Sequence, residues 1–141
     1  MARLTLDLPE QFAFTTEIPI LIGHINYGGH VGNDAILSFI HESRLRYLKH
    51  LGYASELDIN GLGLIMTDTA IIYKAEAFHG DILIAEVVCC DFNKYGCDFL
   101  FKLSSQQTQK EIARAKTGVV FFDYISRKVV NLPDSFLKKV S

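Results

Sequence analysis

The sequence predicts an α+β fold in which an antiparallel sheet wraps around one long helix. A single extended helical segment occurs early in the chain, over residues 34–51. Strand-like segments separated by short turns follow it, at residues 62–74, 81–91, 97–105 and 111–124. The first half of the helical segment is apolar on nearly every side, and such a helix has to be surrounded by protein. Only the strands can cover it, so we expect the sheet to enclose the helix.

Residues 10–22 form the first expected strand, because they mix β-branched and aromatic side chains. We expect an interruption near Pro19, since proline cannot donate a ladder hydrogen bond. Residues 23–32 contain four glycines, and this composition predicts a loop with unusual backbone angles. The first strand therefore leads through a glycine-rich loop into the helix.

Polar residues and a glycine mark the two ends of the expected helix. Asn33 suits the N-cap position, and Asp34 suits the first turn, where a negative charge meets the positive end of the helix dipole. Gly52 follows the last helical residues and predicts a glycine C-cap. The second half predicts an amphipathic helix with leucines opposite basic residues: Leu45, Leu48 and Leu51 against Arg44, Arg46 and Lys49.

The four later strands predict a meander with one solvated face. Apolar and polar residues alternate along residues 97–105, which is typical of a half-buried strand. The links between the strands are short, and short links favour antiparallel hairpins. The Leu132-Pro133 pair ends the sheet region, and residues 134–140 predict a short helix. No repeat or linker interrupts the chain, so we expect a single domain over residues 1–141.

The composition argues against several classes of protein. A formal net charge of -2 does not suit a general nucleic-acid-binding protein, which would carry a basic excess. No apolar run approaches the roughly 18 residues that span a membrane, and the N-terminus lacks the apolar block of a secretory signal. Three cysteines cannot form a disulfide framework, which suggests a reducing compartment. The expected location is therefore the cytoplasm, without membrane association.

Several short motifs of known chemistry are incomplete in this sequence. His41 and Glu42 begin the zinc-protease pattern H-E-x-x-H, but position 45 is a leucine. His24 and His30 share a loop that contains no cysteine, which is weak evidence for metal ligation. No serine lies in a G-x-S-x-G elbow, and no cysteine has a context that suggests an activated thiolate. We therefore expect neither a metal nor a cofactor.

The segment HINYGGHVGN at residues 24–33 delivers the chain directly onto the start of the buried helix. N–H groups at a helix N-terminus have no partner within the helix, and together with the helix dipole they form a site for an oxyanion. Acyl transfer develops such a charge on the carbonyl oxygen, so this geometry suits that reaction. The alternative is that the glycines only shape a tight turn and the polar residues cap it.

Two motifs at fixed spacing, GHVGN at residues 29–33 and IHESR at residues 40–44, resemble the G-H-V-N-N and E-E-A-R segments of hotdog thioesterases. This family includes 4-hydroxybenzoyl-CoA thioesterase. The later segments IIY, GDIL and GVVFFD are similar to further motifs of the family, and the resemblance spans residues 12–135. It implies a hotdog fold with a five-stranded antiparallel sheet around one long central helix. It also implies active sites at a dimer interface, a homodimer or homotetramer, and CoA as the carrier group without a metal.

The resemblance assigns roles to three polar residues of the loop and helix start. Asn33 falls where the family presents a backbone N–H to the thioester oxygen. Asn26 falls where many members have the catalytic aspartate, and His24 occupies the place of another common acid. Gly32 and Ile36 also depart from the usual asparagine and tyrosine. The change at Asn26 matters most, because an amide cannot act as a general base but can hold water or the thioester by hydrogen bonds.

A base must then come from another residue, and two are candidates. Asp68 lies inside an apolar strand, where burial would raise the pKa of its carboxyl toward a useful range. His30 could act as a base near neutral pH, although in the family it is more often structural. Glu42 is expected to pair with Arg46 at i+4 instead.

The resulting hypothesis is hydrolysis of an acyl-CoA or acyl-carrier-protein thioester. The alternative is a catalytically impaired acyl-CoA-binding module that kept the fold after losing its acid. A hotdog hydratase is a weaker hypothesis, because its signature residues are not found. Three cations at expected turns could hold the CoA nucleotide or could simply be solvated: Lys94, Arg127 and Lys128.

Overall fold

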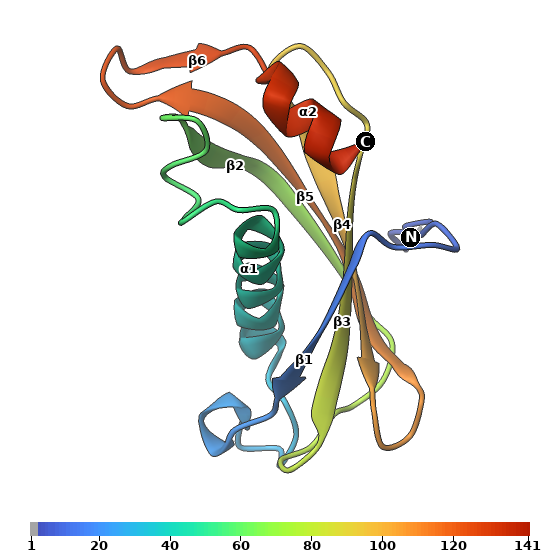
Figure 1. Cartoon of the computed structure of the whole chain (residues 1–141). Coiled ribbons are helices and arrows are strands. Elements are labelled where there is room, and N and C mark those ends of the chain that lie inside the picture. The colour runs from blue at the N-terminus through green and yellow to red at the C-terminus, as the bar shows by residue number, and fades with distance from the viewer. Residues whose placement is uncertain (1–2) are drawn as a thin grey trace.

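The structure is a computed structural model that describes residues 3–141. A six-stranded antiparallel sheet curves around helix α1 (Figure 1), in the order β1-β3-β4-β5-β2 with β6 paired to β5. The strands are β1 (Phe14–Pro19), β2 (Gly63–Tyr73), β3 (Ile82–Cys90), β4 (Gly96–Ser105), β5 (Glu111–Asp123) and β6 (Lys128–Val130). The helices are α1 (Asn33–His50), α2 (Asp134–Val140) and the short 3-10 helix η1 (Ile22–His24). The predicted α+β hotdog fold is therefore confirmed, with one short extra strand.

The order of the strands differs from the predicted meander in one respect. Strands β3, β4 and β5 are joined by hairpins as expected, but β2 pairs with β5 and does not pair with β3. The chain leaves β2 alongside β5, since the N–H groups of Lys74 and Ala75 both donate to the carbonyl of Ile112. Residues 74–81 then cross to the other side of the sheet, so they are a crossover and not a hairpin turn.

Helix α1 begins and ends one residue earlier than expected, at Asn33 and His50, and its C-cap is Leu51, with the predicted Gly52 directly after it. Gly52 has φ of +100°, and its N–H and that of Tyr53 donate to Lys49 and Leu48, both at 3.0 Å. These two bonds form a Schellman motif. At the other end Gly32 is the N-cap, with extended backbone angles and no side-chain cap. The prediction that Asn33 is the N-cap is wrong, because Asn33 already has helical geometry and is the first residue of the helix.

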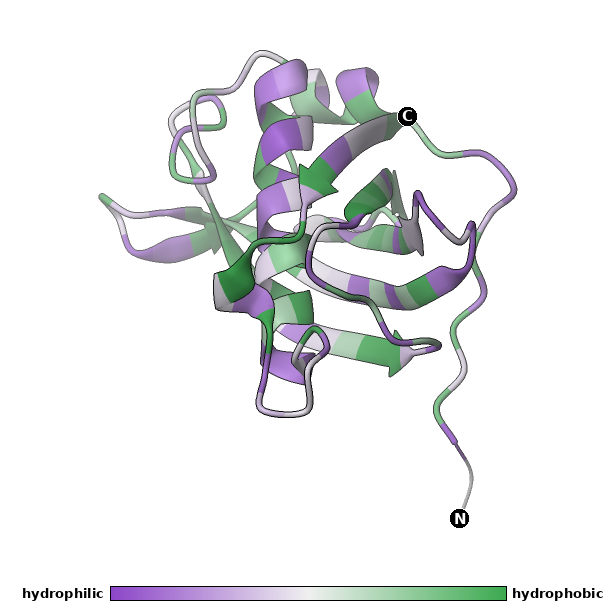
Figure 2. Cartoon of the chain, turned by 90° about the horizontal axis from the view of Figure 1, so that it is seen from below, coloured by the Kyte–Doolittle hydropathy of each residue, from purple (hydrophilic) through white to green (hydrophobic). Residues whose placement is uncertain are grey.

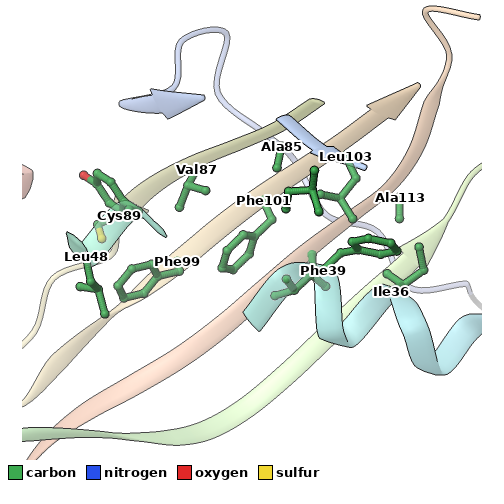
Figure 3. Packing of buried hydrophobic residues seen from close by; sticks show 14 of the residues in the cluster. Ile36, Phe39, Leu48, Ala85, Val87, Cys89, Phe99, Phe101, Leu103 and Ala113 are labelled. Carbon is green, nitrogen blue, oxygen red and sulfur yellow. The ribbon is translucent and has the colours of Figure 1, made fainter. Parts of the chain in front are cut away.

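The core lies between α1 and the concave face of the sheet. Figure 3 shows side chains from α1, such as Phe39 and Leu48, packed against Val87, Phe99 and Phe101 of the sheet. Hydrophobic and hydrophilic bands alternate along the strands (Figure 2), as expected for a sheet with one buried face.

Two predictions about the faces of α1 are wrong. Leu37 is 49% exposed, so the first half of the helix is not covered on every side within this chain. Arg44 is buried although it was expected to face away from the core. Its Nε donates to a carboxylate oxygen of Glu56 at 2.6 Å, and this ion pair makes the burial of the charge possible. The expected i+4 pair is confirmed, with Arg46 Nε 2.7 Å from Glu42.

Candidate functional site

A cavity of about 290 Å³ opens beside the first turn of α1. One wall comes from the loop and helix start, and the other from the end of β2, the crossover and the start of β5. Its lining residues are His30, Val31, Asn33, Ile36, Tyr73, Lys74, Ala75, Glu76, Ala77 and Ile112. The helix start predicted to carry the chemistry therefore borders an open cavity and is not plugged by the core.

The loop before α1 is held in shape by its own polar groups. The side-chain oxygen of Asn26 accepts the N–H of Gly28 at 2.9 Å, and the N–H of Asn26 donates to the carbonyl of His30 at 2.9 Å. Gly29 completes the turn with φ of +82°, a conformation that favours glycine. The N–H of Val31 then donates to the carbonyl of Ala77 at 2.8 Å. This last bond ties the loop to the crossover and so forms the cavity between them.

The start of α1 has backbone N–H groups without a partner in the described part of the chain, and one of the residues that carry them, Asn33, lines this cavity. The N–H of Gly32 donates to His24, and the carbonyl of Gly32 accepts the N–H groups of Ala35 and Ile36. The N–H groups of Asn33 and Asp34 form no hydrogen bond with any residue of the described range 3–141. Free N–H groups at the positive end of an 18-residue helix are a site for developing negative charge.

His30 also lines this cavity, and one of its ring nitrogens has no hydrogen-bond partner within residues 3–141. Its Nδ1 lies 3.1 Å from the carbonyl oxygen of Val31. A carbonyl oxygen only accepts, so this hydrogen bond requires the proton on Nδ1, and in the neutral imidazole the lone pair is then on Nε2. A Cβ on Gly28 would lie 3.3 Å from that Nε2 and 3.2 Å from Oδ1 of Asn26. Glycine at position 28 thus lets His30 and Asn26 approach one another, close to Asn33.

Tyr73 completes one wall of the cavity and was missed by the sequence reasoning. Its hydroxyl donates to the carbonyl oxygen of Asn33 at 3.4 Å, and the side chain is about half exposed. It is the last residue of β2, on the strand face that points toward α1. Lys74 and Glu76 lie at the rim and were also missed. The IIY motif singled out the tyrosine, but nothing in the sequence indicated that it meets the helix start.

Asp68 lies apart from this group, on the opposite face of the sheet. Its carboxylate is 2.7 Å from Nζ of Lys116, and its side chain is 60% exposed. The hydrogen bond from Lys116 lowers the pKa of the Asp68 carboxyl below its usual value. The expectation that burial raises this pKa is therefore wrong. A β-bulge between Met66 and Asp68 is the cause, because it reverses the alternation and turns Asp68 away from the core.

The three cations expected to hold CoA lie far from the cavity of their own chain. Lys94 is in the turn between β3 and β4, over the ring of Tyr95, and Arg127 and Lys128 are at the turn between β5 and β6. Strand β5 runs from the cavity, at Ile112, to that turn, at Asp123. The eleven residue steps between these two positions span about 36 Å. Among residues 3–141, Lys74 is the lysine that borders the cavity of its own chain.

His24 is also outside the cavity. Its Nδ1 accepts the N–H of Leu21 at 2.8 Å, and its ring packs 4.4 Å from that of Phe39. Across residues 3–141, no group of three or more histidine, cysteine or acidic side chains is arranged to hold a metal ion. Nor does any helix in that range have the length and apolar character to cross a membrane.

Residues 20–140 match the sequence model of a family described as the thioesterase-like superfamily. No curated protein matches the sequence. Among solved structures, a 1,4-dihydroxy-2-naphthoyl-CoA thioesterase from Synechocystis is 22% identical, with a TM-score of 0.81 over 90% of this chain and 94% of that one. A gentisyl-coenzyme A thioesterase is 16% identical, with a TM-score of 0.77 over 90% and 98%. A predicted thioesterase from Bacillus stearothermophilus is 15% identical, with a TM-score of 0.79 over 90% and 92%.

Proposed function

The chain belongs to the thioesterase-like superfamily, and from this premise we propose that it hydrolyses the thioester bond of an acyl-CoA. One observation carries the proposal: Asn33, whose N–H has no partner within residues 3–141, and His30, whose Nε2 has none in the same range, line one cavity. The structural relatives that act on CoA thioesters support CoA as the carrier, although at their low identity they establish only the fold.

In this proposal the helix start binds the reacting carbonyl. The thioester oxygen accepts the N–H of Asn33, where the helix dipole stabilises the negative charge of the tetrahedral intermediate. Nε2 of His30 takes a proton from a water molecule as the water oxygen attacks the carbonyl carbon. The C–S bond then breaks, and the same proton passes to the departing thiolate. The products are a free acid and the CoA thiol.

Asn26 has a positioning role in this scheme. Its side-chain oxygen already accepts the N–H of Gly28, and Asn26 itself does not line the cavity. We therefore assign it to holding the loop and His30 in place, with its amide NH₂ group left to bind a water molecule. Asp68 has no role in it, because a carboxylate whose pKa is lowered by Lys116 is a poor proton acceptor and lies on the other face of the sheet.

Hydrolysis is tested by measuring thiol release from a panel of acyl-CoA substrates. We expect turnover by the wild-type protein and a loss of about 100-fold or more in kcat for His30→Gln, since general-base catalysis contributes on this order. His79→Gln is the matched control, because His79 is exposed in the crossover and does not line the cavity. Binding of acyl-CoA without turnover would favour the impaired binding module, and neither binding nor turnover would reject the proposal.

We also propose that the active unit is a homodimer joined through β2, with a homotetramer as a pair of such dimers. β2 pairs with β5 on one edge, and its other edge has no strand partner within residues 3–141. Asp68 is the central residue of the eleven in β2, so symmetric antiparallel pairing sets Gly63 of one copy opposite Tyr73 of the other. The ring of Tyr124 lies against Gly63, so the turn with Arg127 and Lys128 would approach the partner's cavity.

A mixing experiment tests whether the site is shared in this way. The His30→Gln protein should be inactive, and an Arg127→Ala/Lys128→Ala protein should have a raised KM. When the two chains are combined, half of the sites in each mixed dimer should have an intact His30 and intact cations, so low-KM activity should return. If the cations serve their own chain, or if the protein is monomeric at its 15.8 kDa mass, mixing should restore nothing.

A further inference from the structure

The volume of the cavity limits the acyl group that can enter it. Sites for small molecules are typically cavities of about 300–1,000 Å³. At about 290 Å³ this cavity is at the lower end of that range. It therefore suits a medium-length chain or a single substituted ring better than a long fatty-acyl chain.

The residues that line the cavity fall into a polar group, here called the rim, and an apolar group, here called the floor. His30, Asn33, Tyr73, Lys74 and Glu76 bring polar groups to one part of the cavity. The remaining lining side chains are apolar, and four of them are buried: Val31, Ile36, Ala77 and Ile112. A charged group on the acyl tail would lose its water there without gaining a partner. The floor thus suits an uncharged tail whose thioester is held at the rim.

Ile36 is one of the buried residues of the cavity floor. It lies three residues after Asn33, so the two side chains share one face of α1, and a carbonyl held at Asn33 has Ile36 one turn further along. Ile36 is 3% exposed. Figure 3 shows it grouped with Phe39 and Ala113 at the same end of the core. Shortening Ile36 would therefore extend the cavity toward these two apolar neighbours.

From these observations we infer that the substrate carries a compact, uncharged acyl group and that Ile36 sets its maximum length. This inference rests on the proposed thioesterase function and names the substrate class of the same site. The polar and apolar parts of the lining assign the carbonyl to the helix start and the tail to the floor.

The test is a chain-length profile of kcat/KM with acetyl-, butyryl-, hexanoyl-, octanoyl-, decanoyl-, dodecanoyl- and palmitoyl-CoA, with benzoyl-CoA as a ring. The wild-type profile should peak at hexanoyl, octanoyl or benzoyl and fall about tenfold or more by dodecanoyl, since one methylene without room in an apolar pocket changes the rate by about tenfold or more. Ile36→Ala removes three carbons and should move the optimum two or three carbons longer. Ile36→Val should move the optimum by less, and this variant can still be measured if Ile36→Ala folds poorly.

Ile59→Ala is the matched control, because Ile59 is fully buried but does not line the cavity. It should lose stability as Ile36→Ala does and leave the position of the optimum unchanged. A wild-type preference for palmitoyl-CoA, or an unchanged profile in both Ile36 variants, would overturn the inference while leaving hydrolysis established. An inactive wild-type protein that binds a hexanoyl thioether analogue more tightly than a palmitoyl one would refute the hydrolysis alone.

Discussion

Asn33→Pro should fold normally and lose at least about 100-fold in kcat, because proline removes the one backbone N–H assigned to the thioester oxygen. Asn33 is the first residue of α1, the helical position at which proline is best tolerated. The preceding Gly32 has φ of -70° and ψ of 153°, the extended geometry that a residue before proline prefers. The N–H that would be lost has no acceptor within residues 3–141, so the substitution breaks no bond of the fold.

Asn33→Ala separates the backbone donor from the side chain. Alanine keeps the N–H and removes the carboxamide, so this variant should retain a kcat close to that of the wild type. Circular dichroism should show the same helix content for both variants, and calorimetric titration with a thioether analogue should show that Asn33→Pro still binds the ground state. Equal losses of kcat in both variants would assign the effect to the side chain and remove the helix start from the mechanism.

Gly96→Ala should destabilise the fold by at least about 3 kcal/mol, as a substitution that overpacks a site without room to adjust. Gly96 is the buried first residue of β4 and pairs with Val120 of β5. A Cβ at this position would lie 1.8 Å from the carbonyl oxygen of Val119. The atom in the way belongs to the backbone of a central strand, so β4 and β5 would have to separate. Urea unfolding followed by circular dichroism measures the change in the free energy of unfolding.

Gly23→Ala is the control, because it makes the same glycine-to-alanine change at a position with room for a side chain. A Cβ on Gly23 would meet nothing within 4 Å, and its φ is not in the left-handed range. This substitution should change the free energy of unfolding by no more than about 0.5 kcal/mol. Equal stability of the two variants would mean that β4 and β5 do not approach each other as closely as described.

The parts of the site that could be predicted are those encoded by neighbouring residues. The glycine-rich loop and the helix after it follow from local composition, and so does the availability of N–H groups at the helix start. Asn26, His30 and Asn33 were predicted as one group because they lie within a single short segment. Asn26 and His30 do lie together at Gly28, and His30 and Asn33 both line the cavity, but Asn26 does not line it. Tyr73 and Ile112 could not be found in this way, since they reach the cavity from strands distant in sequence.

The clearest difference between sequence and structure concerns Asp68. A strict alternation along β2 would direct this side chain to the same face as Leu64 and Met66, toward the core. The bulge after Met66 adds one residue, and one residue is enough to exchange the two faces of a strand. The extra residue is accommodated because Gly118 of β5 has no side chain: a Cβ there would lie 2.1 Å from Oδ1 of Asp68. A feature that depends on a glycine fifty residues away is not visible in local periodicity.

The sequence by itself determined the helices and main strands, the glycine at the end of α1 and the family resemblance, because each depends on residues that are close in the chain. Tertiary structure alone decided that β2 lies beside β5, that Asp68 pairs with Lys116 on the outer face, and that a cavity forms between the helix start and the crossover. The physical reason is that strand pairing and cavity shape result from contacts between distant segments. Local propensity is compatible with several such arrangements, and the packing of the whole chain selects one of them.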